Sequence, residues 1–340
     1  MTKPRVGFLG VGWIGRHRMA AMLDTGAIEA VGIADTSPAM VAEAAVLAPH
    51  AAVVDGLDAM LALAPDGVVI ATPSALHADQ SIQALQAGAA VFCQKPLGRD
   101  AAEAARVVEA AQRADRLLSV DFSYRFTSGM RAIAELIRGG ELGHVFAIDL
   151  VFHNAYGPDK PWFYDRAQSG GGCVMDLGVH LVDLALWAMG FPALDGAVTS
   201  QLFAGGRRLE TDVVEDFATA SFTLAGGTAV RLACSWRLNA GRDAEIGATF
   251  YGTAGGAALR NVGGSFYDFT AERFRGTATE ALAAPPEEWG GRAAADWAER
   301  LATSRAFDPQ AARLVDVARV LDRIYAGGND GDASEPRFGR

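Results

Sequence analysis

The chain has 340 residues, of which 50% are hydrophobic and 21% are charged, an ordinary composition for a globular protein of two domains. Its formal net charge of −10 excludes a general affinity for nucleic acid, because a phosphate backbone would repel so acidic a chain. Three cysteines at unrelated spacings fit a reducing compartment and predict neither a disulfide framework nor a metal site. A strand is expected within the first residues, and no uncharged run reaches membrane-spanning length. We therefore expect a cytoplasmic protein that enters no membrane.

Residues 1–121 alternate short apolar runs with helical patterns. The expected strands are 6–9, 30–34, 52–53, 67–71, 90–93 and 117–120, and the expected helices are 13–25, 38–48, 57–63, 77–87 and 100–114. This alternation predicts an α/β domain with a doubly wound parallel sheet and helices on both of its faces. Ligands of such sheets bind beyond the carboxyl ends of the strands, which singles out the turns after residues 9, 71 and 93.

The first of these turns carries a glycine pattern between a strand and a helix, which is the context that a dinucleotide fingerprint requires. A second strand then ends in Asp35, about twenty residues after Gly15, where an acid is expected to hold the ribose hydroxyls. We predict that a dinucleotide contacts Gly10, Gly12, Trp13, Ile14, Gly15 and Asp35.

Further candidate residues follow the next two strand ends. Thr72, Pro73 and His77 leave the fourth strand, and Gln94 and Lys95 leave the fifth. We predict that all five line the cofactor crevice, where desolvation would suit Lys95 to proton transfer or to polarising an oxygen. Taken singly, turn and capping chemistry would also explain residues 72–77, and a surface position would explain Lys95.

The rest of the chain predicts an α+β domain with a large open sheet, mostly antiparallel. A helix is expected at 128–138, a strand at 145–153, an aromatic loop at 155–172, strands over 197–270 and closing helices at 292–303 and 308–326. Residues 217–224 and 228–236 are expected to pair as a hairpin. We predict a domain of residues 1–121, a second domain of residues 122–326 whose closing helices pack back on the first, and a loose tail of residues 327–340.

A run of three glycines, Gly170–Gly172, precedes an apolar helix expected to begin near Asp176. Asp176 and His180 are four residues apart, which would place a carboxylate and an imidazole on one face at the positive end of that helix. We interpret the flexible glycine run and this acid–base pair as a site that meets a small molecule. The alternative is an N-capping Asp and a solvated His.

Five motifs, in this order and spacing, resemble the Gfo/Idh/MocA oxidoreductase family. They are the glycine fingerprint, Ala-Thr-Pro-Ser-x-x-His at 71–77, Lys95-Pro96, Tyr124-Arg125-Phe126, and Gly-Gly-Gly-x-x-x-Asp-x-Gly-x-His-x-x-Asp at 170–183. The resemblance implies a Rossmann domain, a C-terminal open-sheet domain, and redox chemistry with NAD or NADP on sugars or polyols. It also implies a catalytic triad of Lys95, Asp176 and His180. Many members have Glu where this chain has Gln94, which removes a negative charge beside Lys95.

In the chemistry that the resemblance implies, a secondary alcohol gives a hydride to the nicotinamide while His180 accepts its proton. Lys95 would stabilise the developing charge on the oxygen, and Asp176 would orient the pair. The alternatives are an NAD-dependent glycosidase that oxidises its sugar only transiently, and a nucleotide-sensing regulator without activity. Asp35 favours NAD over NADP, because its carboxylate would repel a 2′-phosphate.

Predicted contacts with the sugar or polyol substrate lie at Arg125, His153, Tyr156 and Trp162. An aromatic loop can equally close a domain joint without touching a ligand. The second face of the C-terminal sheet is expected to be covered by a symmetry mate, giving a homodimer or homotetramer.

Overall fold

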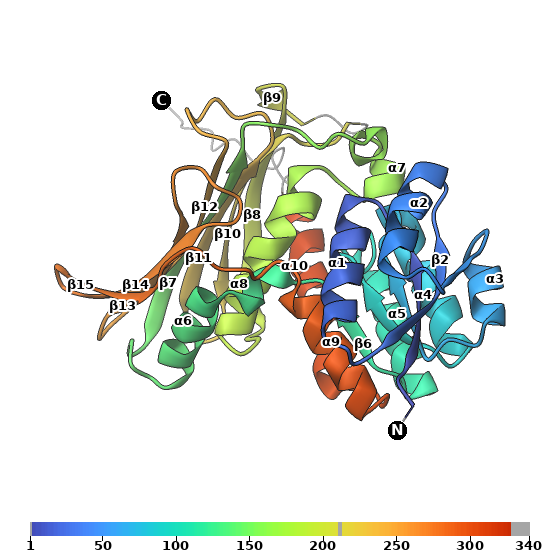
Figure 1. Cartoon of the computed structure of the whole chain (residues 1–340). Helices are drawn as coiled ribbons and strands as arrows, with labels where there is room; N and C mark the ends of the chain where they lie inside the picture. The colour runs from blue at the N-terminus through green and yellow to red at the C-terminus, as the bar shows by residue number, and fades with distance from the viewer. Residues whose placement is uncertain (1, 210–212, 328–340) are drawn as a thin grey trace.

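The computed structural model describes residues 2–209 and 213–327, and it contains two sheets with helices packed around and between them (Figure 1). The first sheet has six strands, all parallel, in the order β3-β2-β1-β4-β5-β6. Its strands are β1 (Arg5–Leu9), β2 (Glu29–Ala34), β3 (Ala52–Val53), β4 (Gly67–Ile70), β5 (Ala90–Cys93) and β6 (Leu118–Val120). The predicted doubly wound α/β domain is confirmed, with each strand within one residue of its expected bounds.

Helices connect these strands. They are α1 (Trp13–Asp24), α2 (Pro38–Leu47), α3 (Leu57–Ala62), α4 (Ser74–Gln86) and α5 (Ala101–Ala114). The prediction that α4 begins at residue 77 is wrong, because the helix starts directly after Pro73, which occupies its N-cap position. His77 therefore lies inside the helix and not at its opening.

Strands β4 and β5 are buried along their whole length, as expected for parallel strands covered on both faces. One covering helix comes from the far end of the chain. Trp297 of α9 (Arg292–Thr303) is fully buried and its ring lies 5.8 Å from Phe92 of β5. A side chain at Gly67 would come within 2.7 Å of the Trp297 ring, so this glycine makes room for the helix.

The second sheet has nine strands in the order β15-β14-β13-β12-β7-β11-β10-β8-β9. Their bounds are β7 (Val145–Asn154), β8 (Leu194–Ala204), β9 (Arg207–Arg208), β10 (Phe217–Leu224), β11 (Thr228–Ser235), β12 (Ala244–Gly252), β13 (Gly256–Asn261), β14 (Phe269–Arg275) and β15 (Ala278–Ala283). Only the β7–β11 pair is parallel among these described strands. The predicted open, mostly antiparallel sheet and the β10–β11 hairpin are both confirmed.

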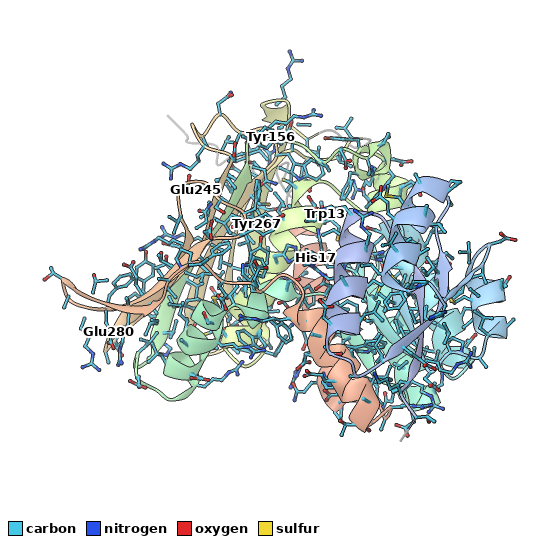
Figure 2. All side chains as sticks on the ribbon, viewed as in Figure 1. Trp13, His17, Tyr156, Glu245, Tyr267 and Glu280 are labelled. Carbon is cyan, nitrogen blue, oxygen red and sulfur yellow. The ribbon has the colours of Figure 1, made fainter. Side chains whose placement is uncertain are left out.

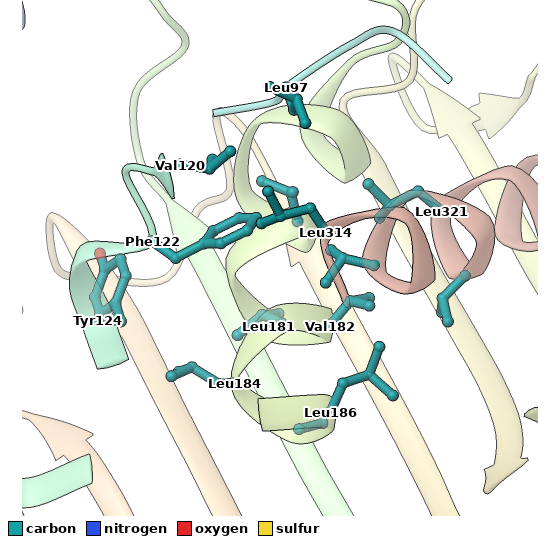
Figure 3. Close-up of a cluster of buried hydrophobic side chains, with 14 of the residues drawn as sticks. Leu97, Val120, Phe122, Tyr124, Leu181, Val182, Leu184, Leu186, Leu314 and Leu321 are labelled. Atoms are coloured by element: carbon teal, nitrogen blue, oxygen red, sulfur yellow. The ribbon is translucent and has the colours of Figure 1, made fainter. Parts of the chain in front are cut away.

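Alternate residues of this sheet face a layer of helices, α6 (Ser128–Arg138), α8 (Val179–Ala188) and α10 (Arg313–Gly327). Figure 3 shows leucines of α8 and α10 meeting Phe122 and Val120 from the end of β6. This apolar cluster joins the two predicted domains through one core. The predicted tail falls outside the described residues, apart from Gly327, which ends α10.

By length and composition alone, the helical segment Arg166–Ala188 could cross a membrane. However, 83% of its most apolar stretch of 18 residues is buried inside the structure. Residues of α8 such as Val182 and Leu186 supply the core between the domains. The α8 part of this segment is therefore a core helix of the fold.

Candidate active site

The backbone of the turn between β1 and α1 requires glycine at positions 10 and 15. Gly10 has φ +82° and a side chain there would come within 2.5 Å of the Ala71 carbonyl oxygen. A side chain at Gly15 would collide with the Gly10 carbonyl. At Gly12, by contrast, a Cβ would meet no atom within 4 Å. The turn therefore leaves open space at the α1 N-terminus, where a pyrophosphate would meet free backbone N–H groups.

Asp35 lies against this turn. Its two carboxylate oxygens each accept a backbone hydrogen bond of 2.8 Å, one from Val11 and one from Ser37. These bonds fix the carboxylate at the end of β2 while leaving lone pairs on both oxygens for ribose hydroxyls. Trp13 stands at the opening of α1, 57% exposed and stacked on His17 (Figure 2).

His77 ties the two neighbouring loops together. Its ring is 1% exposed, with Nδ1 2.7 Å from the Pro96 carbonyl and Nε2 2.7 Å from the Thr72 carbonyl. Burial lowers the pKa of this imidazole. The structure thus places His77 behind the crevice, where it holds the loop after β4 to the loop after β5. Thr72 bonds through its hydroxyl to Gln80, 2.6 Å away.

Lys95 and Asp176 meet, as the triad requires. Lys95 Nζ donates to Asp176 Oδ1 at 2.5 Å and to the Asp176 carbonyl at 2.7 Å. The second carboxylate oxygen accepts from Trp236 Nε1 at 3.0 Å. The Asp176 carboxylate is thereby fixed on both sides, and the lysine from the N-terminal domain is anchored to the helix of the C-terminal domain.

The interpretation of the second glycine run needs correction. Gly172 and Val174 donate their backbone N–H groups to the carboxylate of Glu215, at 3.0 and 2.9 Å. This carboxylate is 1% exposed and also accepts from the Tyr325 hydroxyl at 2.8 Å. The backbone N–H groups at the positive end of the helix are therefore already bonded to a residue of the chain.

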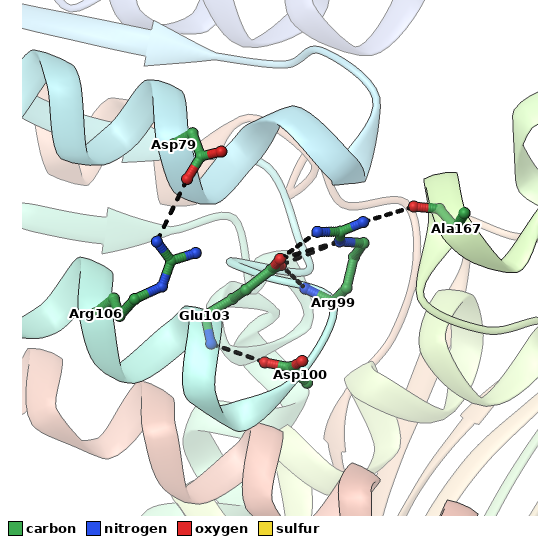
Figure 4. Close-up of polar contacts among 6 residues, drawn as sticks. All are labelled: Asp79, Arg99, Asp100, Glu103, Arg106 and Ala167. Carbon is green, nitrogen blue, oxygen red and sulfur yellow. Dashed lines mark hydrogen bonds and ion pairs between the residues drawn. The ribbon is translucent and has the colours of Figure 1, made fainter.

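The three glycines are needed for close packing and not for flexibility. A side chain at Gly171 would collide with the Tyr325 hydroxyl, and one at Gly172 would collide with the Glu215 carbonyl. Gly170 has φ +85° and lies against Arg99. Figure 4 shows how Arg99 joins this region to the N-terminal domain, bonding to Glu103 of α5 and to the Ala167 carbonyl.

The predicted pairing of Asp176 with His180 also differs in detail. The helix opens with a π-helical turn, Val174–Gly178, ahead of α8, and no hydrogen bond joins the two side chains in the described structure. Such turns occur frequently at functional sites. Here the turn leaves Asp176 directed at Lys95 and Trp236, while His180 is free to act separately.

His180 is set in an aromatic wall. Tyr124 lies edge-on to its ring at 5.0 Å between centroids, and Phe152 lies at 6.3 Å. Nδ1 is buried and has no hydrogen-bond partner among the described residues. Nε2 is not among the buried unpaired atoms of these residues. Burial lowers the pKa of His180 well below 6.5, and the charges of Lys95 and Arg18 lower it further. The imidazole is therefore neutral near pH 7 and able to accept a proton.

Arg125 is bound within the protein, and its predicted contact with a substrate stays a prediction. Its guanidinium bonds to both oxygens of Asp183, with Nε 2.7 Å from Oδ2, and it packs over the rings of Phe122 and Phe191. Asp183 is 1% exposed, so this pair is part of the core between α8 and the domain joint. The pair uses two of the five guanidinium N–H groups, and moving Arg125 away would leave the buried Asp183 carboxylate unpaired.

His153 lies on the wrong face of the sheet for the predicted contact. It follows Phe152, which faces His180, so its own side chain points to the opposite face, where it bonds to Ser235 and stacks on Phe217. The next residue, Asn154, returns to the inner face. Its Oδ1 is buried without a partner among the described residues.

The aromatic loop contacts the site indirectly. Trp162 stacks on Phe163 at 3.8 Å, and Phe163 packs against Trp236. Tyr156 is 58% exposed and donates its hydroxyl to Asp243 (Figure 2). Contact of Tyr156 or Trp162 with a substrate stays a prediction.

Two family models match the chain: an oxidoreductase family with an NAD-binding Rossmann fold over residues 4–122, and a GFO/IDH/MocA C-terminal domain over residues 130–258. The chain belongs to the GFO/IDH/MocA family. Its first domain is an NAD-binding Rossmann domain, and this family member is an oxidoreductase.

Individual relatives agree with this assignment. The D-glucoside 3-dehydrogenase of Escherichia coli is 26% identical over 75% of this chain and 76% of its own length. A putative UDP-kanosamine synthase oxidoreductase subunit of Amycolatopsis mediterranei is 32% identical over 75% of both chains. The solved levoglucosan dehydrogenase complex with NADH and levoglucosan has a TM-score of 0.81 at 21% identity, covering 96% of this chain and 97% of that one. This last likeness shows the shared fold.

The residues present fit the dinucleotide that the family binds. Open space at Gly12, free N–H groups at the start of α1 and the fixed Asp35 carboxylate match a pyrophosphate and a ribose diol. Thr72, Gln94 and Lys95 stand at the strand ends where the nicotinamide would lie.

Proposed function

We propose that this protein transfers a hydride between NAD and a secondary alcohol or ketone of a sugar, inositol or sugar derivative. The observation that carries the proposal is the anchored Lys95–Asp176 pair beside a neutral His180, at the carboxyl ends of the Rossmann strands. The names of two sequence relatives and of the levoglucosan complex point to sugars as the substrate class. NAD, when bound, supplies the nicotinamide carbon that accepts the hydride.

The side chains divide the proton chemistry between them. His180, neutral at pH 7, accepts the hydroxyl proton of the alcohol through Nε2. The ammonium of Lys95 hydrogen-bonds the same oxygen and stabilises its developing negative charge. Asp176 holds Lys95 in place and is itself held by Trp236. In the direction of reduction, the same groups return the proton to the ketone.

Neutral polar groups complete the proposed substrate cleft. Asn154 offers a buried oxygen without a protein partner, which a substrate hydroxyl would satisfy. Tyr124 presents a rigid ring beside His180, held by Phe269 and Trp289. The nearby guanidinium of Arg125 is already neutralised by Asp183, which favours an uncharged polyol over an anionic substrate.

The test is a panel of D-glucosides, anhydrosugars and inositols, incubated with NAD or NADP while NADH formation is followed by absorbance. We expect net NADH formation from at least one sugar, and a much lower rate of it in His180→Ala. Release of a glycosidic substituent without net NADH would instead identify the glycosidase alternative. Nucleotide binding with no turnover of any member would favour a regulator.

We also propose that the chain works in the cytoplasm as a homodimer or homotetramer, and that its domains divide near residue 122. The sheet face opposite α8 supports the assembly. It presents small and apolar residues such as Val151, Ala233 and Gly247 around the Asp149–Arg231 ion pair, in a shallow hollow open to a second copy. Light scattering at micromolar concentration should give a dimer or tetramer mass, and a monomer would refute the assembly.

A further inference from the structure

A buried polar cluster lies at the joint between the first domain and the catalytic helix, outside the proposed triad. It consists of Arg18 from α1, Gln94 after β5, and Asp121 and Ser123 after β6. Asp121 Oδ2 accepts from Arg18 Nε at 2.5 Å and from Gln94 Nε2 at 2.6 Å, and Oδ1 accepts from the Ser123 hydroxyl at 2.6 Å. Asp121 is 2% exposed and Arg18 is 7% exposed.

This cluster fixes which way the Gln94 amide points. A carboxylate only accepts hydrogen bonds, so Gln94 must turn its NH₂ group toward Asp121. The carbonyl oxygen, Oε1, is then directed away from the cluster. Oε1 makes no hydrogen bond to the described residues, and it is not buried among them, so it remains accessible to a ligand. A neutral, pre-oriented acceptor therefore stands one residue before Lys95, at the carboxyl end of β5.

We propose that Gln94 and Asp121 act as a pair: Asp121 carries the negative charge that balances Arg18, and Gln94 presents Oε1 as the acceptor for the carboxamide N–H of the nicotinamide. Gln94 is thus a positioning residue that orients the cofactor ring beside Lys95. This inference rests on the proposed function for its cofactor, and it goes beyond it by assigning the charge arrangement that orients the cofactor ring.

The charge balance explains why residue 94 is uncharged here. A glutamate at this position would put two carboxylates within hydrogen-bond distance of each other, so that one of them would take up a proton. Removing the Asp121 charge alone would leave the Arg18 guanidinium buried without a counter-ion. Exchanging the two groups, with carboxylate at 94 and amide at 121, keeps one negative charge opposite Arg18.

The first experiment measures the melting temperature of the cofactor-free protein for Gln94→Glu, Asp121→Asn and the double variant. The exposed Gln112→Glu substitution on α5 serves as a matched control for adding one charge. We expect both single variants to melt several degrees lower, Gln94→Glu more so as the pH rises. We expect the double variant to recover most of the loss. If the two losses add in the double variant, or if Gln94→Glu behaves like Gln112→Glu, the pairing is refuted.

The second experiment tests the contact with the carboxamide. Reduced 3-acetylpyridine adenine dinucleotide lacks the carboxamide N–H, so the parent protein should bind it about twofold to tenfold more weakly than NADH in a fluorescence titration. Gln94→Met keeps the length of the side chain but loses Oε1, and it should bind both nucleotides equally. An unchanged preference in Gln94→Met would overturn the assignment. Neither experiment needs a substrate, so a failure of the proposed sugar oxidation would be recognised separately.

Discussion

Two glycine-rich turns precede the two helices that matter most here, and they use glycine for opposite reasons. In the turn before α1, Gly12 faces open space, and the helix N-terminus is left free for a ligand. In the turn before α8, the space beside Gly171 and Gly172 is filled by Tyr325 and Glu215, and the helix N-terminus is capped by the Glu215 carboxylate. A glycine run next to a helix therefore indicates close approach, and only the surrounding structure shows whether a ligand or the chain itself approaches.

The first turn is therefore expected to bind the nucleotide through its backbone. The second is expected to contribute side chains that react. With its helix end occupied, the second site must act through side chains. We expect His180→Ala and Lys95→Ala each to lower kcat by about a hundred- to ten-thousand-fold on the true substrate. The double variant should be only slightly worse than the poorer single one, because the residues act as a unit.

The control for this prediction is cofactor binding. NADH affinity, measured by fluorescence titration, should be unchanged in His180→Ala, because the nucleotide turn lies in the other domain. Wild-type turnover in His180→Ala at neutral pH would show that the roles are wrong and would leave Lys95 as the proton carrier.

Alanine substitution compares the two turns directly. Gly172→Ala should destabilise the protein by about 1–3 kcal/mol, because the new methyl group collides with the Glu215 backbone. Gly12→Ala should leave the melting temperature of the cofactor-free protein nearly unchanged and weaken NADH binding instead. Calorimetry and a binding titration on both variants give the comparison. Equal losses of stability in the two variants would remove the distinction between an open and a filled turn.

The fixed carboxylate beside the first turn sets cofactor choice. Asp35→Ala removes the group that would repel a 2′-phosphate, so the ratio of kcat/KM for NAD to that for NADP should fall by about tenfold. The variant also loses two backbone hydrogen bonds, so its melting temperature must be checked. A parent enzyme that already works better with NADP would contradict the prediction.

The depressed pKa of His180 predicts the pH dependence of the second site. Because burial lowers this pKa well below 6.5, His180 stays neutral and competent as pH falls through 6.5. The acid limb of the kcat/KM profile for oxidation should therefore lie below 6.5. An acid limb at or above 6.5, with the protein still folded by circular dichroism, would show that another group accepts the proton.

Sequence patterns predicted the parts of the fold whose signals are local. The strand–turn–helix spacing around Gly10, Gly12 and Gly15 is contained in one short segment, and the same holds for the β10–β11 hairpin. The Arg125–Asp183 pair joins residues 58 positions apart, and the bond between Gly172 and Glu215 joins residues 43 positions apart. A local sequence pattern does not predict such contacts.

The face of a strand is also set by distant pairing. Neighbouring residues of a strand face opposite sides of the sheet. The predicted His153 therefore faces away from the cleft, and Asn154, the next residue, faces toward it. Trp236 was similarly missed as a partner of Asp176, because only the register of β11 beside β7 places it there. A tryptophan directly after a strand of alternating pattern was the one available signal.

The central claim is hydride transfer between a carbon of the substrate and NAD, and isotopic labelling tests it most directly. A sugar accepted by the enzyme would be supplied with deuterium on the carbon that is oxidised, and the product nucleotide examined by mass spectrometry and NMR. We expect deuterium on C4 of the nicotinamide, on one face. NADH formed without deuterium, with the label released to water, would contradict the claim.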